Sequence, residues 1–473
     1  MNRRQFIRTA SLATSGVWMG RFSQAAEAGN FPTVRPAEAA RKFKSAGTER
    51  MIARLKSTAK NKELAWMFEN CFPNALDTSV QFQLADGKPD TFVSAGATDT
   101  MGLRDSSLQV WPYLPLLGTD DDLQQMIAGV IARQTRCILK DPYASSFYRD
   151  ESKTGEWKSD ETEMKPGVHE RKWQLDSLCH PIRLAYHYWK TTSRTAPFDA
   201  AWKSGLMLTL KTFREQQRKT GDGPYHFQRT TTDASETLSR GGYGALVKPV
   251  GLVCSMFRPG GGATMMPFGV PANYFAMVSM RQAADMLEHL AHDRDASNQC
   301  RALAGEIEVA LREHAVVVSE KWGRVYSYEV DGFGNSYCVG DGTVPGLLSL
   351  PYLGAMVISD PVYLNTRKLL LSDGNPYYRK GQAAEGIGSS RLGPNRISPQ
   401  AFIIQGLTTA DDDEVRRCLA SLQKTHAGTG FMHEWFDADD PKKFGPAPTA
   451  AINSIFGELI LKTYKERPYL LNV

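Results

Sequence analysis

The chain has 473 residues, of which 42% are hydrophobic, 10% aromatic and 23% charged, a composition typical of a globular protein with a substantial core. No run of about 18 apolar residues occurs, which argues against a membrane-spanning helix. The formal net charge of +5 is small for this length and indicates no nucleic-acid partner.

The first residues, MNRRQFIRTASLATSGVWMG, pair Arg3 and Arg4 ahead of a weakly apolar stretch, as in a twin-arginine export signal. Ala-Glu-Ala at 26–28 supplies the small residues of a cleavage site. The alternative is an ordinary basic amphipathic N-terminus. We predict that residues 1–28 are a signal peptide and that residues 29–473 form one domain, periplasmic or secreted. Cleavage would remove four Arg and one Glu, leaving a net charge of +2.

Helical periodicity recurs along the rest of the chain. Apolar residues three or four positions apart predict helices around 64–71, 123–131, 280–290, 303–311 and 452–460. Alternating Val/Ile-rich strands are scarce, which argues against a β-sandwich or a βαβ chain. We therefore expect an all-α fold. It is either an (α/α)6 toroid, in which helix pairs close a ring and loops at one end carry the site, or an irregular α bundle.

Seven cysteines are widely spaced along the chain and form no CxxC pair. The twin-arginine route exports proteins that have already folded in the reducing cytoplasm. We therefore expect mostly buried, unpaired thiols that behave as small apolar side chains.

The common metal, nucleotide and nucleophile motifs are missing from the sequence. His433-Glu434 and His169-Glu170 lack the second histidine of a helix-borne zinc site. The three glycines in FRPGGGATM at 257–265 stand in no GxxxxGK[ST] framework, and no GxSxG elbow occurs. We expect neither a metal nor a cofactor.

Carboxylates beside aromatic rings are the remaining chemical signal. Sugars present flat apolar faces ringed by hydroxyls, so their sites combine stacking rings with acids, arginines and amides. Arg104 with Asp105 in one such loop is also consistent with a structural ion pair, and Trp173 in another with a core position. Together the loops predict a glycan site. They are GLRDSSLQVWPY (102–113), HERKWQLDSLCH (169–180), YSYEVDGFGN (326–335), NPYYRKGQAAEGIGSS (375–390) and FMHEWFD (431–437).

These loops belong to a longer series of motifs that resembles glycoside hydrolase family 125. The series begins with TFVSAGATDTMGLRDSSLQVWPYLPL at residue 91, continues through MKPGVHERKWQLDSLCHPIRLAYHYW (164–189), GLVCSMFRP (251–259) and VPGLLSLPYLG (344–354), and ends near residue 460. Characterised members of that family are metal-independent, inverting exo-α-1,6-mannosidases built on an (α/α)6 toroid. The resemblance implies this fold and a glycan or oligosaccharide substrate.

The resemblance also implies roles for individual residues. It places the catalytic base at Glu434, in a Met-His-Glu segment, and gives Arg104 and Asp105 the task of holding sugar hydroxyls. We count further substrate-binding candidates in the same loops and in VGDGTVP (339–345), with Trp173 and Trp435 among the rings that would shape the pocket. These candidates are Trp173, Asp176, Asp341, Glu385 and His433.

The chain departs from the family pattern where the chemistry is expected. After Arg-Pro the family typically has Ser-Asp-Asp-Ala, and one of these aspartates resembles the general acid. This chain has Gly260-Gly261-Gly262 instead. A family tryptophan is replaced by Gly102, and the Ser-Pro-His that follows Gly-Ile-Gly becomes Ser389-Ser390-Arg391.

An inverting glycosidase needs two carboxyl groups with a water between them, and the general acid is worth about 10² to 10⁴ in rate. A neighbouring acid can replace it, with Asp99, Asp341 and Glu385 as candidates. Alternatively, the protein cleaves only bonds with good leaving groups, or binds glycan without cutting it.

We therefore predict an exported glycosidase of this family with altered specificity. Three alternatives stay open at this stage. They are a faithful α-1,6-mannosidase, a catalytically impaired carbohydrate-binding homologue, and a lyase that uses Tyr243 and Arg258.

Overall fold

The computed structural model describes residues 31–96, 98–445 and 450–472. The predicted signal peptide, residues 1–28, lies outside these described residues.

Helices make up most of the regular secondary structure of the described residues, and five of them coincide with the five stretches of helical periodicity. The α-helices are α2 (Ala46–Thr58), α3 (Lys62–Cys71), α4 (Asn74–Thr78), α5 (Leu103–Val110), α6 (Asp121–Lys140), α7 (Leu175–Thr192), α8 (Ala200–Gln216), α9 (Ser239–Gly242), α10 (Val270–His289), α11 (Arg294–His314), α12 (Pro361–Leu370), α13 (Pro399–Leu407), α14 (Asp412–Thr425) and α15 (Ala450–Glu466). Short 3₁₀ segments are η1 (Glu38–Ala40), η2 (Trp111–Thr119), η3 (Ala234–Glu236), η4 (Leu347–Ser349) and η5 (Pro468–Leu471).

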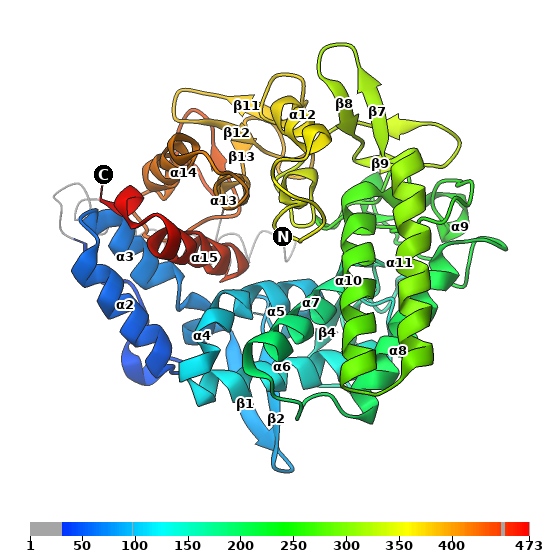
Figure 1. The fold of residues 1–473 in the computed structure, drawn as a ribbon, viewed down its shortest axis with the longest axis horizontal. Coiled ribbons are helices and arrows are strands. Elements are labelled where there is room, and N and C mark those ends of the chain that lie inside the picture. The colour runs from blue at the N-terminus through cyan, green and yellow to red at the C-terminus, as the bar shows by residue number, and fades with distance from the viewer. Residues whose placement is uncertain (1–30, 97, 446–449, 473) are drawn as a thin grey trace, which may run out of the picture.

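The helices form a ring of inner and outer members (Figure 1). Inner helices α10, α7, α5, α15 and α13 contact one another in that order. Outer helices back them, with α11 on α10, α6 on α5 and α7, α3 on α15, and α14 on α13. Because α15 packs against both α3 and α5, the last helix closes the circuit with the first ones.

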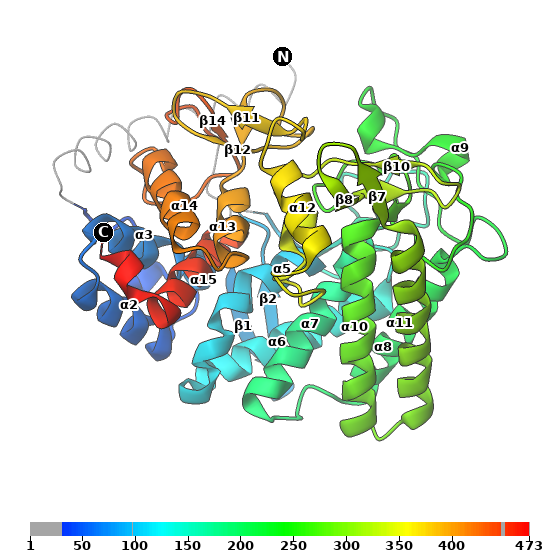
Figure 2. The same cartoon turned by 45° about the horizontal axis from the view of Figure 1, so that its top comes forward.

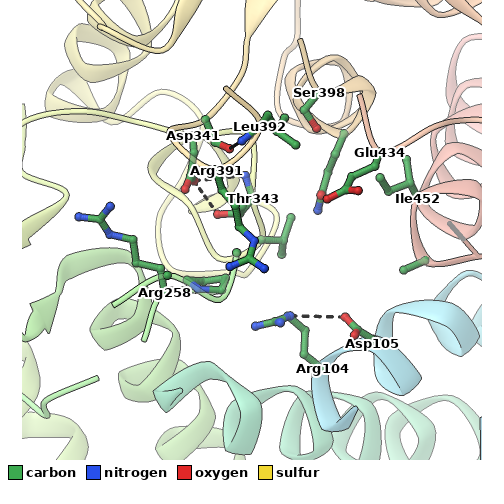
Figure 3. Close-up of a pocket in the computed structure, with 18 of the residues that line it drawn as sticks. Arg104, Asp105, Arg258, Asp341, Thr343, Arg391, Leu392, Ser398, Glu434 and Ile452 are labelled. Carbon is green, nitrogen blue, oxygen red and sulfur yellow. Dashed lines mark hydrogen bonds and ion pairs between the residues drawn. The ribbon is translucent and has the colours of Figure 1, made fainter. Parts of the chain in front are cut away.

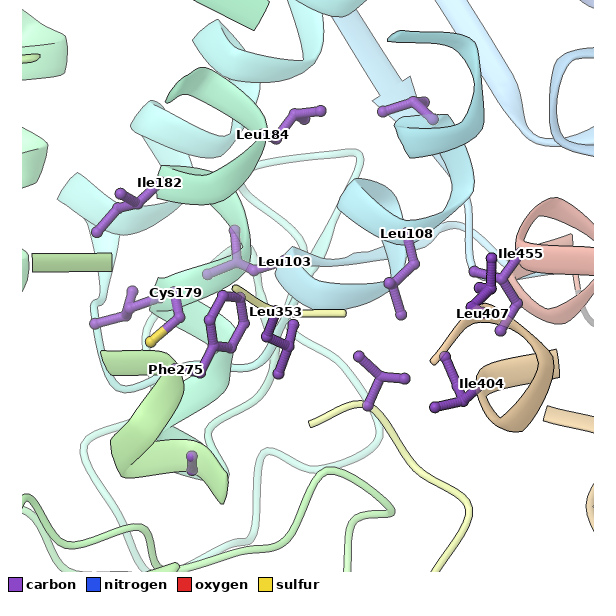
Figure 4. Close-up of a cluster of buried hydrophobic side chains, with 14 of the residues drawn as sticks. Leu103, Leu108, Cys179, Ile182, Leu184, Phe275, Leu353, Ile404, Leu407 and Ile455 are labelled. Atoms are coloured by element: carbon purple, nitrogen blue, oxygen red, sulfur yellow. The ribbon is translucent and has the colours of Figure 1, made fainter. Parts of the chain in front are cut away.

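Apolar side chains of the inner helices fill the space where they meet. Figure 4 shows Leu108 of α5, Cys179 of α7 and Phe275 of α10 in one cluster with Ile404 of α13 and Ile455 of α15. All five are buried, and they belong to one continuous core. Side chains therefore fill the ring where these five residues meet.

The label all-α needs a correction, because the described residues also contain six small antiparallel sheets of two or three strands. The strands are β1 (Val80–Ala85), β2 (Lys88–Val93), β3 (Thr100–Gly102), β4 (Ser146–Tyr148), β5 (Val168–Glu170), β6 (Phe268–Gly269), β7 (Val316–Ser319), β8 (Gly323–Tyr326), β9 (Glu329–Val330), β10 (Ser336–Tyr337), β11 (Tyr378–Lys380), β12 (Glu385–Ile387), β13 (Arg396–Ile397) and β14 (Phe436–Asp437).

Most of these strands are too short to produce an alternating pattern in the sequence, which is why they escaped prediction. The six-residue strands β1 and β2 form a hairpin that pairs Val80 with Val93 and Ala85 with Lys88. The others pair loop segments between helices. Figure 2 shows β7, β8, β10, β11, β12 and β14 gathered at one end of the ring.

The cysteines follow the expectation from the sequence. All seven are unpaired, and six of them are buried. Burial raises the pKa of the Cys137, Cys254 and Cys418 thiols to about 12, so they stay neutral. Among the described helices, none is long and apolar enough to cross a membrane.

Asp120 joins the starts of two helices. Its carboxylate accepts a hydrogen bond from the backbone N–H of Leu123 (3.0 Å), as the N-cap of α6. It also accepts from the Ser45 hydroxyl and the Gly47 N–H, both at 2.7 Å, at the start of α2. One buried side chain therefore satisfies donors of both helices.

We expect Asp120→Ala to lower the free energy of unfolding by about 2 to 4 kcal/mol, because a cap is lost and buried donors are left unpaired. Denaturant unfolding measures this loss. Asp122→Ala, at an exposed position in the first turn of α6, is the matched control. It should cost less than about 1 kcal/mol. Equal losses in the two variants would contradict this role of Asp120.

Candidate active site

A cavity of about 930 Å³ opens at the N-terminal ends of three inner helices. The first turns of α5, α13 and α15 supply part of its wall, and loops from distant parts of the chain supply the rest. A volume of this size suits one or two sugar units. The loops comprise residues 233–236, 258–263, 341–344 and 388–392, together with Glu434.

Glu434 lines this cavity with an exposed side chain. The segment before it is fixed to α15, because the Met432 N–H donates to the buried Asn453 side chain (2.8 Å). Asn453 in turn donates to Asn74 at 3.0 Å. Figure 3 shows the Glu434 carboxylate directed into the open space, across from Arg104 and Asp105. Among the described residues, no hydrogen bond or ion pair engages the Glu434 carboxylate, and the segment before it is anchored to α15.

Arg104 and Asp105 stand in the first turn of α5, on the floor of the cavity. The Arg104 guanidinium donates to Asp176 (2.9 Å) and to Gln174 (3.2 Å), and its Nε lies 3.5 Å from Asp105. Burial raises the pKa of Asp176, and the charge of Arg104 opposes that rise. Because Asp176 is fully buried, its function in this arrangement is to hold Arg104.

Asp341 also lines the cavity, from the loop between β10 and η4. Its two oxygens are engaged as acceptors. One accepts from the Tyr328 hydroxyl at 3.0 Å, and the other accepts from the Thr343 hydroxyl at 2.6 Å. The side chain is only 7% exposed, so its orientation is fixed.

The cavity lining does not include four of the predicted substrate contacts, Trp173, Asp176, Glu385 and His433. Trp173 is 1% exposed and donates its indole N–H to the Cys254 carbonyl (2.8 Å), so it is a core residue. Asp176 is buried behind Arg104.

His433 and Glu385 both lie outside the cavity lining. The His433 ring is buried and stacks on Phe444 with centroids 4.0 Å apart. Burial lowers the pKa of His433 to about 4. Glu385 is exposed on β12, outside the lining. Asp99, considered as a substitute acid, pairs with Lys153 at 2.5 Å on the surface and likewise lies outside the lining.

Glu236 also lines the cavity, although no sequence pattern singled it out. One of its oxygens accepts from Lys172 at 2.6 Å and from Arg229 at 3.2 Å, and the other accepts from Arg391 at 2.9 Å. Burial opposes ionisation, but the hydrogen bond and charge of Lys172, with Arg391, outweigh it and lower the pKa of Glu236. Glu236 is therefore an ionised carboxylate shared by three cations.

The glycine segment forms part of the wall opposite Glu434. Gly260 and Gly262 line the cavity, whereas Gly261 has a φ of +91°, in the region that favours glycine. A Cβ atom at Gly261 would lie 3.2 Å from Nη1 of Arg391. The Arg391 guanidinium therefore occupies space that a side chain at position 261 would need.

Comparison with known proteins agrees with this architecture. The family model for metal-independent α-mannosidases, glycoside hydrolase family 125, matches residues 61–461. The meiotically up-regulated gene 157 protein of Schizosaccharomyces pombe is 36% identical over 458 residues, which cover 93% of this chain and 90% of that protein.

Solved structures give the same result. A Streptococcus pneumoniae structure from a study of metal-independent α-mannosidases, a non-productive complex with α-1,6-mannobiose, is 35% identical. It superposes with a TM-score of 0.86 over 90% of this chain and 100% of that chain. A bacterial glucoamylase bound to acarbose shares the fold alone, with 12% identity and a TM-score of 0.52 over 89% of this chain and 58% of its own. Both are (α/α)6 toroids, as expected for this chain. The chain therefore belongs to the metal-independent α-mannosidases of glycoside hydrolase family 125.

Proposed function

We propose that this protein is an exported glycoside hydrolase that cleaves a glycan with inversion at the anomeric carbon, with a specificity that differs from that of exo-α-1,6-mannosidases. The observation that supports it most is the exposed carboxylate of Glu434 in a cavity of about 930 Å³, facing Arg104 and Asp105. Membership of an α-mannosidase family supports hydrolysis, and the paired arginines near the N-terminus support export.

Glu434 acts as the general base in this mechanism. It takes a proton from a water molecule, whose oxygen attacks the anomeric carbon while the glycosidic bond breaks on the opposite face. Arg104 donates to sugar hydroxyls and Asp105 accepts from them. Asp176 contributes indirectly, because its ion pair fixes the guanidinium of Arg104.

Three further cavity carboxylates, Asp233, Glu236 and Asp341, are already engaged by neighbouring hydrogen-bond donors, and this supports the altered specificity. The Ser235 hydroxyl and N–H both donate to Asp233 and lower its pKa. Lys172 and Arg391 keep Glu236 ionised. Asp341 has both oxygens engaged by Tyr328 and Thr343. The favoured substrates are therefore those whose leaving group departs without a proton.

The engagement of Asp233, Glu236 and Asp341 by neighbouring groups also favours a second candidate, a carbohydrate-binding homologue without turnover. A panel of aryl α- and β-glycosides, scored for phenol release, separates the two. We expect release from at least one α-glycoside, α-mannoside first. If calorimetry detects binding of a sugar while no member of the panel is cleaved, the binding function replaces hydrolysis.

A further inference from the structure

Two arginines stand on the wall of the cavity that faces Glu434. Figure 3 shows the Arg391 guanidinium at the open space, across from the Glu434 carboxylate, whereas the Arg258 side chain extends away from that space. Both residues line the cavity. In an inverting displacement the base and the leaving group lie on opposite faces of the sugar ring, so this wall is where the leaving group departs.

Carboxylates behind the two arginines hold them in place. Arg258 donates from Nε (2.6 Å) and Nη2 (2.9 Å) to Glu329, which is 1% exposed. Arg391 donates from Nη1 to Glu236 at 2.9 Å, and its side chain is half exposed. A guanidinium has five N–H donors in a planar fork. After its bond to Glu236, Arg391 keeps N–H groups for a ligand in the cavity, whereas Arg258 helps to build the wall behind it.

Glycine makes room for this arrangement. Gly260 and Gly262 put only backbone on the wall. At Gly261 the Arg391 guanidinium lies where a side chain would begin, 3.2 Å from the Cβ position. A permanent cation therefore stands at the leaving-group side of the site, in a place where a carboxyl group would be needed to deliver a proton.

A guanidinium does not release its proton at any physiological pH, so it cannot act as a general acid. It does stabilise an oxygen that departs with negative charge, and it binds phosphoryl oxygens through paired N–H donors. A singly protonated phosphoryl group on the anomeric oxygen is such a leaving group, because it departs as the hydrogen phosphate dianion without taking up a further proton.

We propose that the substrate of this site carries a phosphoryl group on its anomeric oxygen, and that Arg391 binds that group as it leaves. This inference rests on the proposed function, with Glu434 as base. Glu434 takes one proton from water, and the water oxygen bonds to the anomeric carbon. The C–O bond breaks, and its electron pair stays on the phosphate oxygen. The products are the free sugar of inverted configuration and inorganic phosphate, and the proton on Glu434 passes to solvent.

The test compares α-mannose 1-phosphate, methyl α-mannoside and 2,4-dinitrophenyl α-mannoside as substrates of the full chain. We expect kcat/KM for the 1-phosphate to exceed that for the methyl glycoside by at least about 10²-fold. Arg391→Gln should lower the ratio of kcat/KM for the 1-phosphate to that for the dinitrophenyl glycoside by at least about tenfold. Arg416→Gln, at an exposed ion pair with Asp413 outside the cavity, should leave this ratio unchanged.

Two further measurements show on which oxygen the phosphoryl group stands. Inorganic phosphate should compete with the dinitrophenyl glycoside, and Arg391→Gln should raise its inhibition constant. Methyl α-mannoside 6-phosphate should not be cleaved. Cleavage of that compound in preference to the 1-phosphate would place the anion on the sugar itself and overturn the inference. Cleavage of the dinitrophenyl glycoside alone, with no inhibition by phosphate, would overturn it and leave the proposed function standing. No cleavage of any compound would overturn both.

Discussion

Glu434→Gln is expected to lower kcat/KM for an aryl α-mannoside by about 10² to 10⁴-fold, since the amide cannot take a proton from water. The change keeps the shape of the side chain, so we expect KM and the affinity for the free sugar to stay within about threefold of wild type. Steady-state kinetics and calorimetry measure the two effects. Thermal stability should not fall, because the side chain is exposed and not packed in the core.

Glu385→Gln is the matched control for this prediction. It makes the same chemical change at an exposed carboxylate on β12 that does not line the cavity. Its kinetics should equal those of the wild type. If Glu434→Gln turned over as fast as this control, Glu434 would have no part in the reaction.

Gly262→Asp is expected to give the opposite result, a gain of activity on glycosides with poor leaving groups. A Cβ atom at position 262 would lie 3.8 Å from its nearest neighbour, Cβ of Ser235, which is ordinary contact, and Gly262 has no positive φ. A carboxyl group placed here faces the leaving-group side of the cavity. Supplying a proton donor should raise kcat/KM for methyl α-mannoside by about 10² to 10⁴-fold.

The dependence of rate on leaving-group pKa is the decisive readout for this variant. In the wild type, kcat/KM should fall steeply from dinitrophenyl to nitrophenyl to methyl α-mannoside. In Gly262→Asp the same series should be flatter. Gly261→Asp is the comparison, because its φ of +91° and the 3.2 Å approach to Arg391 disfavour a side chain. A steep series in both variants would mean that a carboxyl group on this loop does not reach the leaving oxygen.

The ring of helices could be predicted because its signals are local and repeated. Apolar spacing marked α3, α6, α10, α11 and α15, and the motif series added the toroid. The small sheets could not be predicted, because pairs such as β13 with β14 join two-residue segments from distant loops. Such pairing depends on where the ring brings the loops together, and no local pattern encodes it.

The candidate site was predicted in part, for a related reason. Motifs identify a loop, but they do not tell which of its side chains face the cavity. Glu434 lines the cavity while its neighbour His433 is buried, and Arg104 lines it while Asp176 supports it from behind. Glu236 was missed because it lies in a polar stretch with no apolar period and no aromatic residue beside it.

Closure of the ring by α15 means that the active cavity is made from both ends of the described chain. Arg104 comes from its first inner helix, and Glu434 stands just before its last. A ribosome must therefore finish almost the whole polypeptide before a sugar can meet both side chains.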